Sequence, residues 1–377
     1  MSLRRVWAVT RKELQHIIRD RSTMILVLIS PTALLLLMAY ALTVDIQNVP
    51  IAVLDLDRTT YSRKFIQQIT AGRDLELFAQ VDSHDQIESL LVNGEVKAAL
   101  IIDPAFSSDL ISLKGMPLQI IIDGTEPESG GYAVEHISWR AEEFVDKALK
   151  DQIQAMGVRV DSLQPIDLRV RTWFNPSLKP RVDMIPGLIS MVLGFPALSV
   201  ALTFAHEREH GTLEQLMATP IGRTELLLGK MIPYILVGLV NVIVIPIIAI
   251  IWFDIPFNGD PVLFFFLSAI FLFALLAMGI IVGVFMHTQA AALAVSFLVI
   301  FFPGFFLTGI FFPIASMPEM MRMEAMFLPG THYATITRGV FLTAIGLDVL
   351  WPYAIMLIIL GLVFVGIAAM FFKKKLG

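Results

Sequence analysis

Long apolar blocks alternate with polar segments along most of the chain. A helix rises about 1.5 Å per residue, so about 20 apolar residues span the hydrocarbon core of a bilayer. Six blocks reach this length, namely Met24–Val44, Met184–Ala205, Leu226–Trp252, Pro261–Met286, Ala290–Phe312 and Val349–Phe372. The pattern predicts a polytopic α-helical membrane protein with six transmembrane helices, the first over 23–44 and the other five within 182–377.

The polar stretch 45–181 between the first two blocks predicts an inserted α/β domain. Short apolar runs alternate there with amphipathic segments, which is typical of strands joined by helices. We expect strands at Val49–Leu56, Leu75–Val81, Ala98–Ile102, Leu118–Ile122 and Leu168–Phe174. We expect helices between them at Tyr61–Thr70, His84–Val92, Ala105–Leu113 and Gly131–Met156.

Basic residues predict the orientation of the chain, because cytoplasmic loops are rich in Lys and Arg. Six of them precede the first block and Lys373, Lys374 and Lys375 follow the last, whereas 253–260 has none. Both termini are therefore expected in the cytoplasm, with 45–181 on the other side of the cell (inner) membrane. Residues 45–179 hold 13 Lys+Arg and 21 Asp+Glu, so the predicted extracytoplasmic domain is acidic.

The first 22 residues predict an amphipathic helix lying on the inner leaflet. Apolar residues recur at helical spacing while the basic residues fall largely elsewhere. The apolar set is Leu3, Trp7, Leu14, Ile17 and Ile18. A polar extension that only enforces topology is the alternative interpretation.

Composition narrows the class of protein further. Hydrophobic residues make up 56% and charged residues 16% of the 377 positions, and mean hydropathy is +0.73. The net charge of −5 leaves no basic excess for binding nucleic acid. The absence of cysteine excludes thiol catalysis and cysteine-based metal sites.

Carboxylates at predicted strand ends (Asp55, Asp57 and Asp123) could indicate a metal or phosphoryl site. No nucleophile or glycine-rich phosphate cradle accompanies them, which favours ordinary strand-to-loop polarity.

The apolar blocks contain no obvious source of energy. Lys230 is the one Asp, Glu, Lys or Arg residue inside them, whereas ion-coupled carriers usually keep ionisable groups at mid-membrane. The chain also lacks a G-x-x-x-x-G-K-[ST] phosphate loop. Asn241 is the main strongly polar side chain within a block and is either a substrate-path residue or a hydrogen-bond donor between helices.

The segment after the second block contains His206-Glu207-Arg208-Glu209-His210, an H-E-x-x-H pattern. On a helix this spacing places two histidines on one face to bind zinc, with the glutamate as general base. A membrane-embedded zinc metalloprotease is therefore the alternative function. Against it, Leu213 and Leu216 stand where the extended motif needs Gly and His.

The same segment matches a longer pattern, E-R-E-x-G-T-L-E-Q-L-x-x-[ST]-P, through Glu207-Arg208-Glu209, Gly211-Thr212-Leu213-Glu214-Gln215-Leu216 and Thr219-Pro220. It resembles the cytoplasmic element of the ABC-2 family of ATP-binding-cassette transporter permeases, in the drug-exporter-like branch. The resemblance also covers Arg11-Lys12-Glu13, the late block Phe302-Pro303-Gly304 to Arg338-Gly339, and the six-span plan with its insertion.

The resemblance implies a permease subunit that exports a hydrophobic or amphipathic substrate, drug-like or lipid. Separate ATPase subunits would bind ATP and Mg, so this chain is expected to hold no cofactor. A second copy or a paralogue would complete the complex. If the host has two membranes, the inserted domain either caps the exit path or meets a periplasmic membrane-fusion adaptor.

The resemblance further implies a cytoplasmic coupling helix at 206–222 and outer-leaflet re-entrant helices at 313–346. The residues implied in coupling to the ATPase are Arg11, Lys12, Glu13, Glu207, Arg208, Glu209, Gly211, Thr212, Glu214 and Gln215. A receptor or scaffold whose acidic domain does the work is a third hypothesis.

Overall fold

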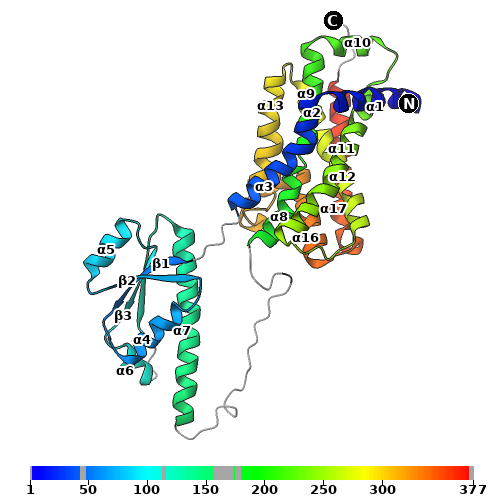
Figure 1. Cartoon of the computed structure of the whole chain (residues 1–377). Coiled ribbons are helices and arrows are strands. Elements are labelled where there is room, and N and C mark those ends of the chain that lie inside the picture. The colour runs from blue at the N-terminus through cyan, green and yellow to red at the C-terminus, as the bar shows by residue number, and fades with distance from the viewer. Residues whose placement is uncertain (1, 43–47, 113–115, 156–173, 175–179, 373–377) are drawn as a thin grey trace. The chain divides into compact units, whose positions relative to one another are not determined.

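The structure is a computed structural model that describes residues 2–42, 48–112, 116–155, 174 and 180–372 (Figure 1). The chain forms two compact units, a helical bundle (Met1–Thr43 with Arg171–Gly377) and an inserted domain (Val44–Val170). Each unit has its own core of buried apolar side chains. The second unit begins one residue before the polar stretch 45–181 and ends within it.

Six helices of the described residues are long and apolar enough to span a membrane, as predicted. They are Arg21–Ala41, Pro180–Glu209, Arg223–Phe253, Pro261–Phe285, Gln289–Phe306 and Leu347–Phe371. The fifth was expected to reach Phe312 but ends at Phe306. Leu307–Phe312 form turns instead, with Gly309 in the left-handed region at φ 79°, a conformation that stops a helix.

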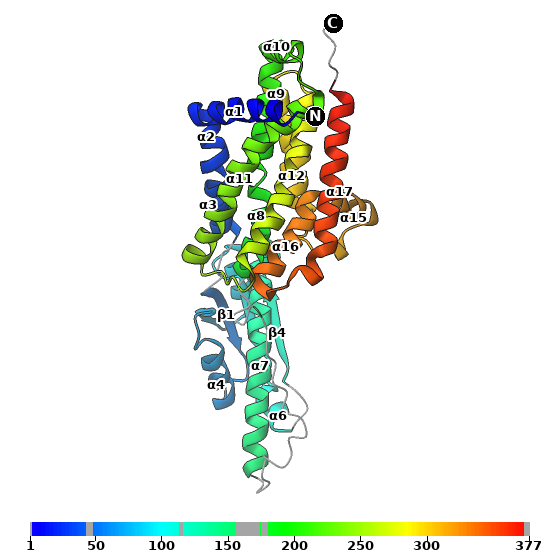
Figure 2. The same cartoon turned by 90° about the vertical axis from the view of Figure 1, so that its right-hand side faces the viewer.

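The bundle comprises sixteen helical elements in the described residues. They are α1 (Leu3–Arg19), α2 (Arg21–Met24), η1 (Ile25–Ile29), α3 (Ser30–Leu42), α8 (Pro180–Val192), α9 (Phe195–Glu209), α10 (Thr212–Ala218), α11 (Arg223–Phe253), α12 (Pro261–Phe285), α13 (Gln289–Ser296), η3 (Phe297–Phe301), α14 (Phe302–Phe306), η4 (Ile314–Ser316), α15 (Glu319–Met326), α16 (Pro329–Thr343) and α17 (Leu347–Phe371). α1 and α10 lie at one end of the bundle, and α3 ends and α8 begins at the opposite end (Figures 1 and 2).

Two spans contain a π-helical turn just before a proline. η1 precedes Pro31 and η3 precedes Pro303. Proline lacks an N–H and its ring clashes with the carbonyl four residues earlier, so the helix widens locally instead of breaking. The carbonyls released in this way need other donors, because lipid offers none.

Close packing at the centre of the bundle depends on glycine. Gly279 and Gly283 are one turn apart on α12 and face α9. A Cβ atom on Gly279 would lie 2.3 Å from the carbonyl oxygen of Ala197, and one on Gly283 would lie 2.7 Å from Cβ of Phe204. Small residues at this spacing let two membrane helices approach closely.

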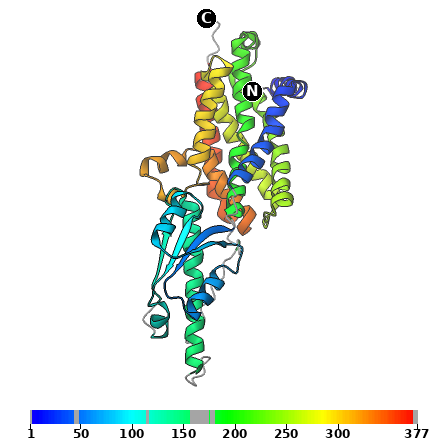
Figure 3. The ribbon, with the colours of Figure 1, turned by 60° about the vertical axis from the view of Figure 1, so that its left-hand side comes forward.

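The segment predicted as re-entrant helices at 313–346 does contain two helices, α15 and α16. α15 extends away from the bundle (Figure 3), and four of its methionines are exposed. α16 is instead largely buried: the ring of Tyr333 stacks on Phe271 with centroids 3.9 Å apart, and its hydroxyl hydrogen-bonds to Ser268. α16 is therefore part of the core as well as a connection to α17.

The inserted domain is an α/β domain, as predicted. Its sheet has the order β2-β1-β3-β4, with β4 antiparallel to β3 and the other pairs parallel. The elements are β1 (Val49–Asp55), α4 (Thr60–Ile69), β2 (Leu75–Val81), α5 (His84–Val92), β3 (Ala98–Ile102), α6 (Phe106–Ile111), β4 (Leu118–Ile122) and α7 (Pro127–Ala155). The fifth predicted strand, Leu168–Phe174, lies outside the described residues except for Phe174, which is in a bend.

Each face of this sheet is covered by helices because β1 and β3 are apolar on both faces. Ile51 and Val53 pack with Phe65 of α4 and Phe144 of α7, whereas Leu54 belongs to a second cluster that includes residues of α5. This arrangement explains the near-continuous apolar runs in the parallel strands.

Carboxylates at the strand ends bind local hydroxyl and amide groups. Asp57 accepts hydrogen bonds from Thr59 and Ser107, both at 2.5 Å, and Asp55 accepts one from Ser62 at 2.7 Å. Asp123 accepts one from the Thr125 hydroxyl at 2.6 Å. No group of three metal-binding side chains occurs among the residues that the structure describes. The geometry thus supports the structural interpretation of these acids.

Candidate functional site

The N-terminal helix α1 lies across the end of the bundle and packs on α11 (Figure 2). Its buried face consists of Val6, Val9, Thr10, Glu13 and Ile17. Of the apolar stripe expected to face the inner leaflet, Ile17 is buried against the bundle, whereas Leu3, Trp7 and Ile18 are exposed and Trp7 retains 66% of its surface. α1 has two apolar faces, and the one against the bundle also carries a carboxylate.

Gly229 allows α1 to approach α11 closely. The Thr10 hydroxyl donates to the Gly229 carbonyl at 3.2 Å, and a Cβ on Gly229 would lie 2.7 Å from Cβ of Val9. At the start of α1, Glu225 of α11 accepts from the backbone N–H groups of Ser2 at 2.5 Å and Gly222 at 2.8 Å. These contacts hold α1 along its length.

Four charged side chains from three helices meet beneath α1; we call Lys12, Glu13, Glu207 and Lys230 the ion-pair cluster. Nζ of Lys230 lies 2.9 Å from Oε1 of Glu13 and 2.9 Å from Oε2 of Glu207. Nζ of Lys12 lies 2.8 Å from Oε1 of Glu207 and 3.4 Å from Oε1 of Glu13. The cluster joins α1, α9 and α11 and has no net charge.

Burial makes the cluster energetically important. The side chain of Lys230 is 0% exposed, that of Glu13 is 1% and that of Glu207 is 8%. An isolated charge in such surroundings is very costly, whereas paired charges are tolerated. The three helices are therefore held in one arrangement as long as all four groups are present and charged.

Lys12 is the half-exposed member of the cluster. Partial burial alone would lower its pKa, but the hydrogen bond and charge of Glu207, together with the charge of Glu13, outweigh burial and raise it. Lys12 therefore remains protonated at neutral pH and pairs with Oε1 of Glu207, while Lys230 lies at Oε2.

Glu207 was expected to form ion pairs with a soluble partner, and the structure corrects this expectation. Its carboxylate is turned into the bundle and pairs with two lysines of the same chain. Lys230 was expected only as a charge near the end of a span. The signal that could have revealed its role is a lone lysine in an apolar block, since such a residue must find a carboxylate.

The predicted coupling helix at 206–222 is not one helix. Residues 206–209 continue α9, Gly211 follows with φ 70°, and α10 covers Thr212–Ala218. The charge on Glu207 is neutralised inside the bundle, so α9 extends past the point where the apolar block ends. Thr219 is extended and ends α10 before Pro220, because the residue before a proline disfavours the helical conformation.

Arg208 and Glu209 bind the turn between α12 and α13. Arg208 donates to the carbonyls of Val284 at 2.6 Å and Met286 at 3.2 Å. Glu209 accepts from the backbone N–H of Gln289 at 3.0 Å, at the start of α13. These bonds satisfy backbone groups that the helix ends leave unpaired.

Among the coupling residues, Thr212, Glu214 and Gln215 on α10 and Arg11 on α1 are exposed. Lys12 and Glu209 are exposed as well, but each already binds a group of the bundle. Leu213 is buried and anchors α10 to the bundle. α10 thus presents a small polar surface on a support that is tied to the spans through α9.

The histidines of the H-E-x-x-H pattern do not form a zinc site with Glu207. The rings of His206 and His210 lie 4.2 Å apart, and Nδ1 of His210 bonds to the His206 carbonyl at 3.0 Å. Glu207 points into the ion-pair cluster and cannot act as a base for water on a metal between these histidines. In the part of the chain that the structure describes, no third metal ligand accompanies them.

Asn241 is a structural residue rather than part of an open substrate path. It is buried, and its Nδ2 donates to the Val27 carbonyl at 2.6 Å. Val27 is four residues before Pro31 and lies in η1, so Asn241 replaces the donor that proline lacks. This outcome is the second of the two interpretations predicted for Asn241.

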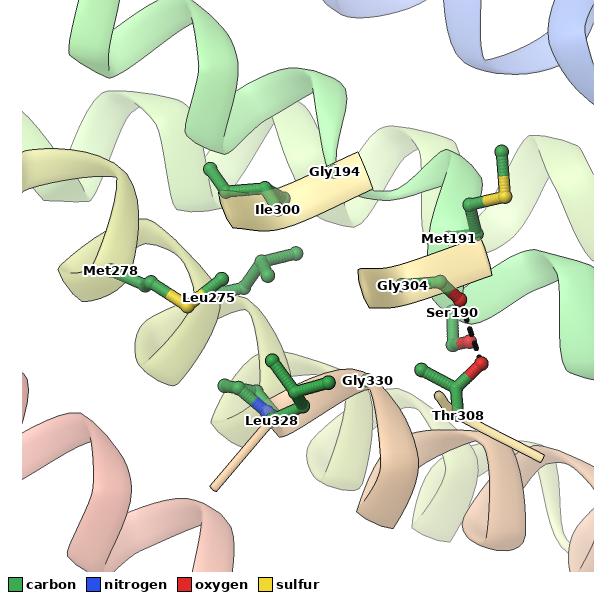
Figure 4. A pocket seen from close by; sticks show the side chains of 11 residues that line it. Ser190, Met191, Gly194, Leu275, Met278, Ile300, Gly304, Thr308, Leu328 and Gly330 are labelled. Atoms are coloured by element: carbon green, nitrogen blue, oxygen red, sulfur yellow. Dashed lines mark hydrogen bonds between the residues drawn. The ribbon is translucent and has the colours of Figure 1, made fainter. Parts of the chain in front are cut away.

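A small cavity lies between the kink of the second span and the fifth span (Figure 4). Its volume is about 20 Å³, which is room for about one water molecule. The lining residues are Ser190, Met191, Gly194, Leu275, Met278, Ile300, Gly304, Thr308, Leu328, Pro329 and Gly330. In this conformation the cavity is closed to anything larger.

Comparison with known proteins agrees with this geometry. The family described as ABC-2 family transporter protein matches residues 21–370. The chain is 26% identical to the probable multidrug ABC transporter permease YbhS of Escherichia coli (strain K12), over 100% of this chain and 98% of the relative. Identity is 26% to the probable multidrug ABC transporter permease YbhR of the same organism, over 92% of each chain. It is 24% to the inner membrane transport permease YhhJ of that organism, over 100% of this chain and 98% of the relative. The chain belongs to the ABC-2 family of transporter proteins.

Proposed function

We propose that the chain is the permease subunit of an ABC exporter and moves a hydrophobic or amphipathic molecule with energy from a separate ATPase. The observation that carries the proposal is the ion-pair cluster, which ties α1 and α9 to α11 at the end of the bundle where α10 is exposed. The relatives named as multidrug permeases support the same function.

The cluster suits the transmission of movement. A displacement of α10 acts on α9 through the turn at Gly211, and Glu207 passes it to α11 through Lys230 and to α1 through Lys12. Arg208 and Glu209 pass it to the α12–α13 turn. Helices packed and paired in this way move as rigid bodies rather than bending independently.

We infer that Glu214 and Gln215 on α10 and Arg11 on α1 contact the ATPase directly, because they are exposed. Glu13, Lys12 and Glu207 act behind them. ATP and Mg belong to the ATPase in this proposal, and a second copy or a paralogue of the chain completes the pathway. The end of the bundle with α1 and α10 is then cytoplasmic, and the inserted domain is outside the cell membrane, where an adaptor is the proposed partner.

The cargo class follows from the spans. The small cavity is lined mostly by apolar atoms, with the hydroxyls of Ser190 and Thr308 as its polar side chains. The hydroxyl of Thr308 is already bonded to the Gly304 carbonyl at 2.7 Å (Figure 4). Lys230 is the one Asp, Glu, Lys or Arg residue in the apolar blocks, and it is paired, so the spans suit a drug-like molecule or a lipid better than a sugar or an ion.

The test is ATP hydrolysis by the complex purified from membranes of the source cells through a tag on this chain. Glu214→Lys is expected to lower hydrolysis about tenfold or more, because it reverses an exposed charge at the proposed contact. Glu324→Lys on α15 is the matched control, an exposed glutamate on another short helix, and is expected to leave hydrolysis unchanged. Equal hydrolysis by both variants and the unmodified complex, or no ATPase in the purified complex, would contradict the proposal.

A further inference from the structure

A second, larger hollow lies beside the ion-pair cluster, between the α1–α2 corner, α9 and the start of α13; we call it the corner cleft. Its volume is about 630 Å³. One wall is formed by Ser199, Leu202, Thr203 and His206, whose spacing places them on one face of α9. The other wall turns the corner: it is formed by His16 and Arg19 at the end of α1, Asp20 at the corner, and Ser22, Thr23 and Leu26 at the start of the first span.

Basic side chains stand at the outer end of the corner cleft. Arg19 is exposed, and no ion pair or hydrogen bond joins its guanidinium to another of the described residues. The imidazoles of His16 and His206 face the cleft from the two walls. Five N–H donors of an arginine in a fixed planar arrangement are suited to the oxygens of a phosphate group.

Asp20 is the acidic residue among those that line the cleft, and its carboxylate is hydrogen-bonded to neighbouring residues of the chain. Its carboxylate accepts hydrogen bonds from the N–H groups of Ser22 at 3.2 Å and Thr23 at 3.1 Å, and from the Thr23 hydroxyl. The bond from Thr23 lowers the pKa of Asp20, so the carboxylate remains ionised and caps the first span. It leaves the donors of Arg19 and the histidines free for a ligand.

The inner end of the cleft contains an unpaired hydroxyl. Ser199 is 2% exposed, and its Oγ has no hydrogen-bond partner among the described residues. Thr203, one turn later, shows the usual solution, since its hydroxyl bonds to the Ser199 carbonyl and to Tyr234. A buried polar atom without a partner indicates a missing ligand group or water.

The walls and surroundings of the cleft are those of a site for an amphiphile. Leu26 and Leu202 line it between the polar ends. Ile18 at the end of α1 and Ile25 in the first span, each next to a lining residue, are 62% and 52% exposed, which suits contact with lipid tails. Ser199 and His206 are seven residues apart on α9, or about 10 Å along the helix. A lipid headgroup could therefore reach both ends.

We propose that the corner cleft binds the phosphate-bearing headgroup of an anionic membrane lipid. Arg19, His16 and His206 donate to the phosphate oxygens, and Ser199 bonds to the headgroup deeper in the cleft. The acyl chains lie outside, against Ile18 and Ile25. Binding itself does not depend on the proposed export function, whereas the role of such an amphiphile as cargo rests on it.

The test uses the full-length chain in detergent micelles and phosphatidylglycerol with a fluorophore on its acyl chain. We expect phosphatidylglycerol to bind at least tenfold more tightly than labelled phosphatidylcholine. Arg19→Gln should weaken the binding of phosphatidylglycerol about tenfold, because one charge-assisted contact is lost. Ser199→Ala should weaken it severalfold without unfolding the chain, because its hydroxyl has no partner to lose. Arg4→Gln is the matched control, since Arg4 is exposed on the same helix and does not line the cleft.

Three results would overturn the assignment. Equal binding of the two lipids removes the preference for an anionic headgroup. If Arg19→Gln and Arg4→Gln bind phosphatidylglycerol with equal affinity, the lipid does not bind in the corner cleft. Displacement of the labelled lipid by millimolar inorganic phosphate shows a site for free phosphate instead. If binding behaves as expected but phosphatidylglycerol in proteoliposomes does not change ATP hydrolysis by the purified complex, the headgroup site stands and its role as a cargo site is rejected.

Discussion

Nζ of Lys230 lies 2.9 Å from Oε1 of Glu13, although the two residues are 217 positions apart and both side chains are almost completely removed from solvent. This pair joins the N-terminal helix α1 to the third span. Nearly all hydration of both is lost, so each charge depends on its partners in the cluster; Lys230 also pairs with Glu207, and Glu13 also lies near Lys12. The pair is therefore one of the contacts that fix where α1 lies.

Removing the cation of the pair should destabilise the bundle strongly. Lys230→Met keeps the length of the side chain but leaves Glu13 and Glu207 buried together with only Lys12 between them. Breaking a buried ion pair from one side typically costs about 3–5 kcal/mol. The measurement is the midpoint of thermal unfolding in detergent.

A compensating change is the control for this prediction. Lys230→Met combined with Glu13→Gln removes one charge of each sign and should recover much of the lost stability. If the double variant is no more stable than Lys230→Met alone, the loss comes from packing and the electrostatic interpretation is wrong.

Lys12 predicts a dependence on pH at the alkaline end. Its pKa is raised in the folded protein above the ordinary value of 10.5 by Glu207 and Glu13 against the effect of burial. A raised pKa means that the stabilisation is fully present below the unfolded pKa and is lost as pH rises through the folded pKa. The difference in unfolding midpoint between the unmodified chain and Lys12→Gln should be constant from pH 6 to 9 and vanish above the raised pKa. A difference that shrinks between pH 6 and 9 would contradict the assignment.

Asn241 predicts a coupling between two spans that can be measured by a double-mutant cycle. Asn241→Leu should cost about 1 kcal/mol, because the Val27 carbonyl loses its donor in a non-polar setting. In a Pro31→Ala background a backbone N–H becomes available for that carbonyl, so the same change should cost less. Equal costs in the two backgrounds would show that Asn241 does not compensate for the proline.

Gly279 predicts a steric limit on the approach of α12 and α9. Gly279→Ala would place Cβ 2.3 Å from a backbone oxygen, so the helices must separate and folded protein should be lost or strongly destabilised. Gly366→Ala is the matched control, because a Cβ there meets no atom within 4 Å. It should be neutral or slightly stabilising, since alanine favours helix. Size-exclusion yield and thermal unfolding report both results.

Local pattern was sufficient for much of the fold. The six spans and the strands of the inserted domain up to Ile122 each depend on residues within one helix or strand. Hydrophobic length, strand alternation and turn chemistry are local properties, so they can be read before any tertiary contact is known. The wrong end of the fifth span, Phe312 instead of Phe306, shows the limit of apolar length as a guide.

The arrangement of side chains in the candidate site was harder to predict from the sequence than the fold. The resemblance placed Glu207 in one coupling group with Lys12 and Glu13, and these three side chains do meet, but the direction in which Glu207 points was not predicted. Helical periodicity around Glu207 fits a charged surface equally well, because it does not say which face meets another helix. Only the contacts of Lys230 with Glu13 and Glu207 show that the face of α9 with Glu207 meets another helix.

The sequence by itself determined that this is a six-span membrane protein with an inserted α/β domain and a charged segment after the second span, because these features follow from the length of apolar runs and from local conformational preference. Only the tertiary structure decided that Glu207 is buried against Lys230, that Asn241 serves the carbonyl before Pro31, and that Ser199 and Arg19 line one cleft. Each of these is a contact between distant parts of the chain, and such contacts depend on how whole helices pack rather than on the preference of any single residue.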